Sequence, residues 1–69
     1  MPYVSNQELP LSVREHLPLR AQEIFLATFN RTYEDREGDP RQEEIAFRIA
    51  WSAVKKRYHK VGSGWQPNE

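Results

Sequence analysis

Apolar side chains recur three and four positions apart through the middle of the chain, which is the spacing of one helical face. The pattern predicts a helix over residues 18–36, and the opposite face of that helix is mainly charged. The predicted apolar face consists of Ala21, Ile24, Phe25, Thr28, Phe29, Thr32 and Tyr33. A helix with such a stripe needs a second element to cover it.

A second long helix is predicted over residues 40–60. Asp39 stands at the N-cap position, Pro40 at the first helical position and Gln42 at the third, which is a capping-box arrangement. The helix carries a stripe of small residues with aromatic residues beside it: Ala46, Ala50, Ala53 and Val54, flanked by Phe47, Trp51 and Tyr58.

Small residues let two helices approach closely, while flanking aromatic rings supply most of the buried area. We therefore expect the two long helices to pack on each other. The predicted contact joins Ile24, Phe25 and Phe29 on the first with Ala50, Trp51 and Val54 on the second.

The pair Leu-Pro occurs twice near the start of the chain, at Leu9-Pro10 and Leu17-Pro18. Proline is tolerated in the first turn of a helix and disfavours helical angles in the residue before it. Each pair can therefore end one segment and begin the next, which predicts a short helix over 10–16. With a polar tail over 62–69, the fold class is all-α: a small three-helix domain spanning residues 1–69.

Length and composition narrow the classes of function. The chain has 69 residues, ten basic and ten acidic, with no cysteine, so a disulfide framework and thiolate metal sites are excluded. A zero net charge argues against a wholly basic nucleic-acid binder. The start, MPYVSNQELP, lacks the pattern of a signal peptide, and no stretch is apolar enough to span a bilayer. We expect a cytoplasmic protein, peripheral to any membrane process.

The sequence shows no recognisable catalytic or metal-binding motif. His16 and His59 are far apart, and no serine stands in a nucleophile motif, so we expect no enzyme, no catalytic residue and no cofactor. The alternating acids Asp35, Glu37 and Asp39 resemble the start of a calcium loop. Proline at position 40, where that loop needs glycine, favours a solvated loop and no metal site.

A cluster of positive charge closes the second long helix: Lys55, Lys56, His59 and Lys60. Bases at a helix C-terminus complement the helix dipole, so the cluster is explained in part as a solvated helix end. No acid lies one turn from Lys55 or Lys56 to offset their charge. We predict that all four side chains are exposed and that any anionic partner docks there.

Several segments in their order and spacing resemble the ChaB family of small bacterial and viral proteins, which are named for cation transport regulation. They are MPY at the start, the two Leu-Pro pairs, AQEIF followed by FN, and AWSAVKKRY. The resemblance implies a compact three-helix domain with a minimal β pairing of the two termini, residues 2–4 with the stretch around Trp65. Tyr3 and Trp65 are then expected to pack near one another. The family supplies no catalytic residues.

Two functions follow from these observations. The first is a non-enzymatic regulatory or adaptor protein that binds another protein, as the family name implies. The second is a nucleic-acid-associated module that uses the basic end of the last helix. Some members of the family are joined to nucleic-acid-binding modules of the type at the N-terminus of the Rho termination factor. The sequence leaves the partner and the oligomeric state open.

Overall fold

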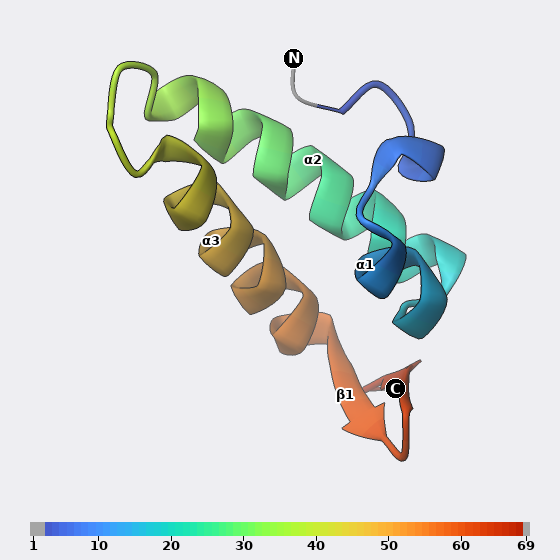
Figure 1. Cartoon of the computed structure of the whole chain (residues 1–69). Helices are drawn as coiled ribbons and strands as arrows, with labels where there is room; N and C mark the ends of the chain where they lie inside the picture. Colours follow the sequence, from blue (N-terminus) through green and yellow to red (C-terminus); the bar gives the residue numbers. More distant parts are fainter. Residues whose placement is uncertain (1–2, 69) are drawn as a thin grey trace.

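A computed structural model describes residues 3–68 of the chain. Two long helices lie side by side and contact each other more extensively than any other pair of elements, while an N-terminal segment covers one side of them (Figure 1). A short hairpin extends from the end of the last helix. In chain order, the elements are η1 (Asn6–Glu8), α1 (Leu11–His16), α2 (Leu19–Asp35), α3 (Gln42–Arg57), β1 (Tyr58–Val61) and β2 (Gly64–Pro67).

The predicted role of the two Leu-Pro pairs is confirmed. Pro10 and Pro18 are the residues immediately before α1 and α2, and Leu17 has the extended backbone expected before a proline. Leu9 and Leu17 are both buried in the core. Each pair therefore ends one segment and also anchors it to the rest of the protein.

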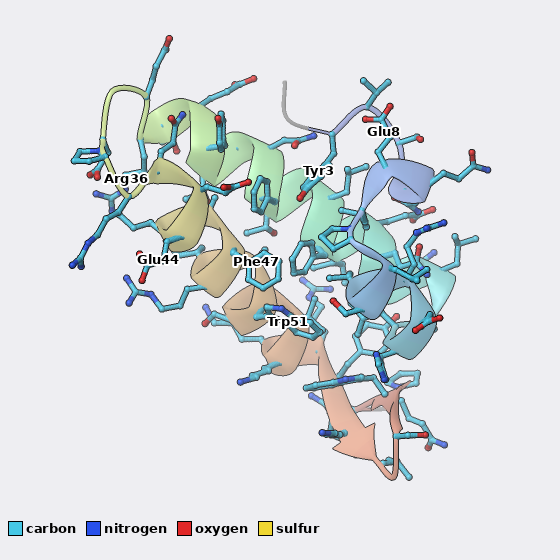
Figure 2. The ribbon with its side chains drawn as sticks, viewed as in Figure 1. Tyr3, Glu8, Arg36, Glu44, Phe47 and Trp51 are labelled. Carbon is cyan, nitrogen blue, oxygen red and sulfur yellow. The ribbon has the colours of Figure 1, made fainter. Side chains whose placement is uncertain are left out.

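The core follows the predicted stripes. Phe25 and Phe29 of α2 are fully buried, as are Ala46, Ala50 and Val54 of α3. Ile24 and Trp51 are partly buried against this core, so the predicted contact between the two helices is confirmed. Phe25 meets the rings of Phe47 and Trp51 edge-on, with centroids 5.4 and 5.5 Å apart, a favourable aromatic geometry. Figure 2 shows Phe47 and Trp51 on the inner side of α3.

The start of α3 is later than predicted. A turn occupies Pro40 and Arg41, and α3 begins at Gln42 with Arg41 at its N-cap position and no side-chain cap. The Asp39 carboxylate accepts a hydrogen bond from the Arg41 backbone N–H at 2.8 Å. The backbone carbonyl of Asp39 accepts a second hydrogen bond from the Gln42 backbone N–H at 3.0 Å. Asp39 therefore shapes the turn before the helix instead of capping the helix itself.

The end of α3 is earlier than predicted, and a hairpin replaces its expected last turn. Tyr58 leaves the helix with extended angles, so residues 58–61 form β1 instead of helix. The strand pairs antiparallel with β2, and Lys60 stands opposite Trp65. Gly62 occupies the first turn position with φ of +60°, where glycine carries no steric penalty.

The minimal sheet therefore does not join the two termini. Trp65 lies in a strand as expected, but its partner is β1, and neither Tyr3 nor Val4 is in a strand. Pro2, the remaining residue of the expected N-terminal strand, lies outside the described residues. The described N-terminal segment lies beside α2, whereas the hairpin extends beyond the end of α3 (Figure 1).

Tyr3 and Trp65 pack on different parts of the core, so the expectation that they pack on each other is wrong. The Tyr3 ring lies 4.9 Å from Phe29, and the Trp65 ring lies 5.6 Å from Trp51. The backbone of Tyr3 is also fixed on both sides by Asn30. The Tyr3 N–H donates to Asn30 Oδ1 at 3.3 Å, and Asn30 Nδ2 donates to the Tyr3 carbonyl at 2.8 Å.

Candidate anion-binding surface

The four predicted site residues lie at the hairpin end of the molecule. Lys55 and Lys56 belong to the last turn of α3, and His59 and Lys60 belong to β1. All four side chains are exposed, as predicted. They do not share one helical face, because the chain leaves the helix at Tyr58.

The hairpin separates His59 from Lys60. Side chains alternate between the two faces of a strand, so Lys60 shares a face with its partner Trp65, and His59 lies on the other face with Gln66. His59 Nδ1 lies 3.0 Å from Asn68 Oδ1. The structure thus distributes the predicted cluster over several directions.

Asn68 holds the returning strand against the end of α3. Its backbone N–H donates to the Arg57 carbonyl at 2.9 Å, and its side-chain Nδ2 donates to the Lys56 carbonyl at 3.1 Å. Both are terminal helix carbonyls, which lack partners within the helix. The bonds fix the backbone of Lys56 and Arg57 beside the hairpin.

The side chains of Lys56 and Arg57 line a hollow of about 520 Å³, which we call the basic groove. A third cation, Arg20, comes from the first turn of α2, because the antiparallel helices place the start of α2 beside the end of α3. The complete lining is Arg20, Ile24, Lys56, Arg57, Tyr58, Pro67 and Asn68.

Sequence reasoning missed Arg20, which is one of the charged residues of the predicted helix over 18–36. A signal for it existed: two long helices joined by a short loop run antiparallel, so the start of one lies beside the end of the other. Arg57 lies beside Ile24 in the groove, where the aliphatic stem of an arginine can cover apolar surface. Lys55, by contrast, does not line the hollow.

The basic groove continues between the two long helices. A second hollow of about 410 Å³ shares Ile24, Lys56 and Arg57 with it, so the two form one feature, which we call the interhelical groove. The added lining is small and mainly apolar: Ala27, Thr28 and Ala53. The groove thus combines an uncharged floor with three cations at one end.

This arrangement suits binding of an anionic group. A guanidinium pairs with a carboxylate or phosphate through two parallel hydrogen bonds, and an ammonium acts as a mobile point charge. The lining contains no histidine, carboxylate or thiol that would serve as a general base or nucleophile. Within residues 3–68, no three His, Cys, Asp or Glu side chains come together in a way that would hold a metal ion.

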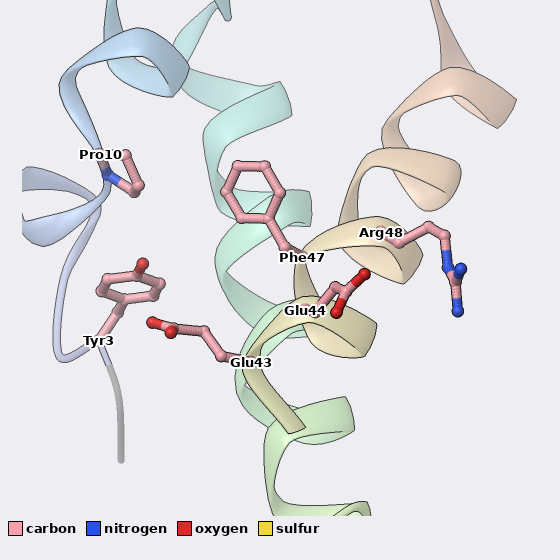
Figure 3. A pocket seen from close by; sticks show the side chains of 6 residues that line it. All are labelled: Tyr3, Pro10, Glu43, Glu44, Phe47 and Arg48. Atoms are coloured by element: carbon pink, nitrogen blue, oxygen red, sulfur yellow. The ribbon is translucent and has the colours of Figure 1, made fainter. Parts of the chain in front are cut away.

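A separate hollow of about 540 Å³ lies beside the N-terminal segment, between Tyr3, Pro10 and the first turns of α3 (Figure 3). The Glu43 side chain extends toward Tyr3, and Phe47 closes the side near Pro10. Burial raises the pKa of the Tyr3 phenol above its ordinary value of about 10, and the negative charge of Glu43 raises it further.

This pKa shift predicts a loss of stability in alkali. Below about pH 10 the phenol is protonated in folded and unfolded chains alike. Above that pH the unfolded chain loses the proton first, so the free energy of unfolding falls until the pH passes the raised pKa of the folded state. Urea unfolding at about pH 9 and about pH 11 should show this fall in the parent and a smaller fall in Tyr3→Phe. Equal falls in the two proteins would contradict the assignment.

The fold defines a class: small helical proteins with a two-stranded hairpin after the last helix. The ChaB family model matches residues 9–68, so the chain belongs to the ChaB family.

No helix within residues 3–68 has the length and apolar character needed to cross a membrane.

Similar proteins and a similar solved structure support this assignment. The chain is 42% identical over 66 residues to the Escherichia coli K12 protein named "Putative cation transport regulator ChaB", covering 87% of each chain. It is 36% identical over 53 residues to a Lymantria dispar nuclear polyhedrosis virus protein, covering 77% of this chain and 70% of the viral one. An NMR solution structure of ChaB superposes with a TM-score of 0.86 at 35% identity, covering 99% of this chain and all of that one.

Proposed function

We propose that this protein is a non-enzymatic regulator that acts by binding another protein at the basic end of the α2–α3 pair. The observation that carries the proposal is the interhelical groove, in which Arg20, Lys56 and Arg57 converge from two helices beside an apolar floor. The regulatory role agrees with the name of the bacterial relatives.

A protein partner fits this surface better than a nucleic acid. The three cations are confined to one end, and the chain has a net charge of zero. A nucleic acid binds through a row of phosphates, so it favours an extended basic face, and acids elsewhere on the molecule repel it. The α2–α3 loop and its flanks are acidic, with Glu34, Asp35 and Glu37 at the opposite end.

The first test is recovery of a partner with the purified protein as bait. The parent should retain a specific protein, and the Lys55→Glu/Lys56→Glu variant should lose it. The matched control is Arg36→Glu/Arg41→Glu, which makes the same change in net charge at two exposed residues of the far end. The control should retain the partner, and thermal unfolding should confirm that all three proteins are folded.

The nucleic-acid alternative is tested with the same proteins. Mixed-sequence DNA and RNA are titrated at low salt and at physiological salt, since phosphate contacts make binding steeply salt-dependent. The proposal expects no salt-sensitive binding in the micromolar range. Such binding, lost in Lys55→Glu/Lys56→Glu while protein recovery is unchanged, would replace the proposal with the alternative.

A further inference from the structure

We infer that the interhelical groove receives an acidic amphipathic α-helix of the partner protein. The inference rests on the proposed function and adds the kind of segment that binds. Apolar side chains of that helix contact the floor at Ala27 and Ala53, and its carboxylates meet Arg20, Lys56 and Arg57.

The groove lies on the side of the α2–α3 pair that the N-terminal segment leaves open. Leu9, Val13 and Leu17 belong to the covered side, where they join Phe25 and Phe29 in the buried core. On the open side, Ile24 and Thr28 are half-buried and Ala27 is exposed. Among residues 3–68, the N-terminal segment covers the other side, and no element covers the pair along Ala27 and Ala53.

The apolar surface extends along α3 beyond the groove. Ile49 and Ile45 lie one and two turns before Ala53 on the same helical face, and both are half-buried. The open side is therefore an apolar strip along the helix pair. Two packed helices leave a furrow into which the ridge of a third helix fits, and the small side chains of Ala27 and Ala53 allow it to come close.

Helical elements line the floor of the groove between α2 and α3. The floor thus has no free strand edge for an extended peptide, which binds by adding a strand to a sheet, and strands meet the groove only at the hairpin end, through Tyr58 and Pro67. A helix satisfies its own backbone hydrogen bonds, so it needs only side-chain contacts with this surface. The shape and chemistry of the floor therefore favour a helical occupant.

The charges determine both the composition and the direction of the bound helix. Three cations stand at one end of the groove, and two are arginines, which pair well with carboxylates. Acidic residues are most stable in the first turn of a helix, where they complement the dipole. The acidic N-terminal turn of the occupant should therefore lie at the basic end. This direction is parallel to α2, which also starts there.

The decisive experiment places a photo-crosslinking residue, p-benzoylphenylalanine, at one of two positions in the full chain. Position 27 is in the floor of the groove, and position 52 is exposed on α3 and outside the lining of the groove. Cells producing either protein are irradiated, and the crosslinked segment is sequenced by mass spectrometry. Position 27 should capture a protein segment with net negative charge and apolar residues at helical spacing. Position 52 should capture it at a several-fold lower yield.

The captured segment is then synthesised as a peptide, and its binding is measured by fluorescence anisotropy. Lys56→Glu should weaken binding by about tenfold or more, because it places a like charge beside the carboxylates. Lys55→Glu is the matched control, with the same change one residue away and outside the groove, and should weaken binding by less than about threefold. Circular dichroism should show that the bound peptide gains helix.

The outcomes separate this inference from the proposed function. Two results would contradict binding in the groove while leaving the proposed function intact. One is a protein partner captured mainly from position 52, and the other is an equal loss of peptide affinity in Lys55→Glu and Lys56→Glu. Capture at position 27 of nucleic acid, of a second copy of this chain or of a segment without acidic helical character would also overturn it. The proposed function itself is contradicted by a different result: the parent protein, used as bait, recovers no specific protein.

Discussion

Replacing Phe25 with alanine is expected to lower the free energy of unfolding by about 3 to 5 kcal/mol, the cost of removing a fully buried aromatic ring. Its ring contacts Phe29 on its own helix and Phe47 and Trp51 on α3. A cavity here removes partners from both long helices at once. Globular proteins have roughly 0.05 to 0.15 kcal/mol of stability per residue, so a chain of 69 residues has about 3 to 10 kcal/mol in all. The variant should therefore lose a large part of its total stability, and at the lower end of this range much of it would be unfolded without denaturant.

Leu19→Ala is the matched control for this experiment. Leu19 lies on the same helix and is also large and apolar, but it is 65% exposed, whereas Phe25 has no exposed surface. Its replacement should change stability by less than about 0.5 kcal/mol. Thermal and urea unfolding followed by circular dichroism measure both variants. Similar midpoints for Phe25→Ala and Leu19→Ala would show that the core is centred elsewhere.

Deleting residues 62–69 is expected to destabilise the protein by about 3 kcal/mol. The deletion removes the half-buried ring of Trp65, and burying about half of a ring of about 200 Å² contributes about 2 kcal/mol. It also removes the bonds from Asn68 to the carbonyls of Lys56 and Arg57, each worth about 0.5 to 1.5 kcal/mol. The end of α3 would then lose both the packing of the Trp65 ring and the hydrogen bonds from Asn68 to its last carbonyls.

Two single substitutions divide this effect into its parts. Trp65→Ala should account for about 2 kcal/mol and Asn68→Ala for about 1 kcal/mol, measured by urea unfolding. In a Trp51→Phe background, Trp65 is the remaining tryptophan, and its fluorescence should shift to the red on unfolding because its ring is half-buried. A deletion variant with the parent's unfolding midpoint would show that the hairpin contributes nothing to the fold. Trp65 emission unchanged on unfolding would place its ring in water.

The deletion also bears on the groove, since Pro67 and Asn68 belong to its lining. Loss of binding by the truncated protein would therefore combine two causes. Lys56→Glu and Lys55→Glu avoid this difficulty, because both residues are exposed and neither side chain belongs to the core.

The sequence by itself determined the helices and the residues that they bury. The spacing of Ala21, Phe25 and Phe29 follows from the helical period, and any fold of this chain must remove that stripe from water. The Leu-Pro pairs act through local backbone sterics, which do not depend on distant residues. The helical period also predicted that Lys55 and Lys56 are exposed, because the apolar stripe of α3 fixes which face of that helix is buried.

Tertiary contacts decided where α3 ends. Residues 58–60 have no proline or glycine to stop a helix, so local preference allows α3 to continue. The chain turns into β1 because Tyr58 reaches the core, Trp65 packs on Trp51 and Asn68 bonds to the last helix carbonyls. These contacts form only when the tail folds back. The same effect moved His59 and Lys60 out of the predicted helix and into β1.

Tertiary structure also decided the composition of the candidate site. Arg20 and Lys56 are far apart in the sequence, and only the antiparallel packing of α2 and α3 brings them to one groove. Periodicity tells which face of a helix is buried, but it carries no information on which neighbour stands beside the exposed residues. The positions of Tyr3 and Trp65 were decided in the same way. Both rings are stabilised by packing on apolar surface. The packing of the helices provides that surface at Phe29 for Tyr3 and at Trp51 for Trp65.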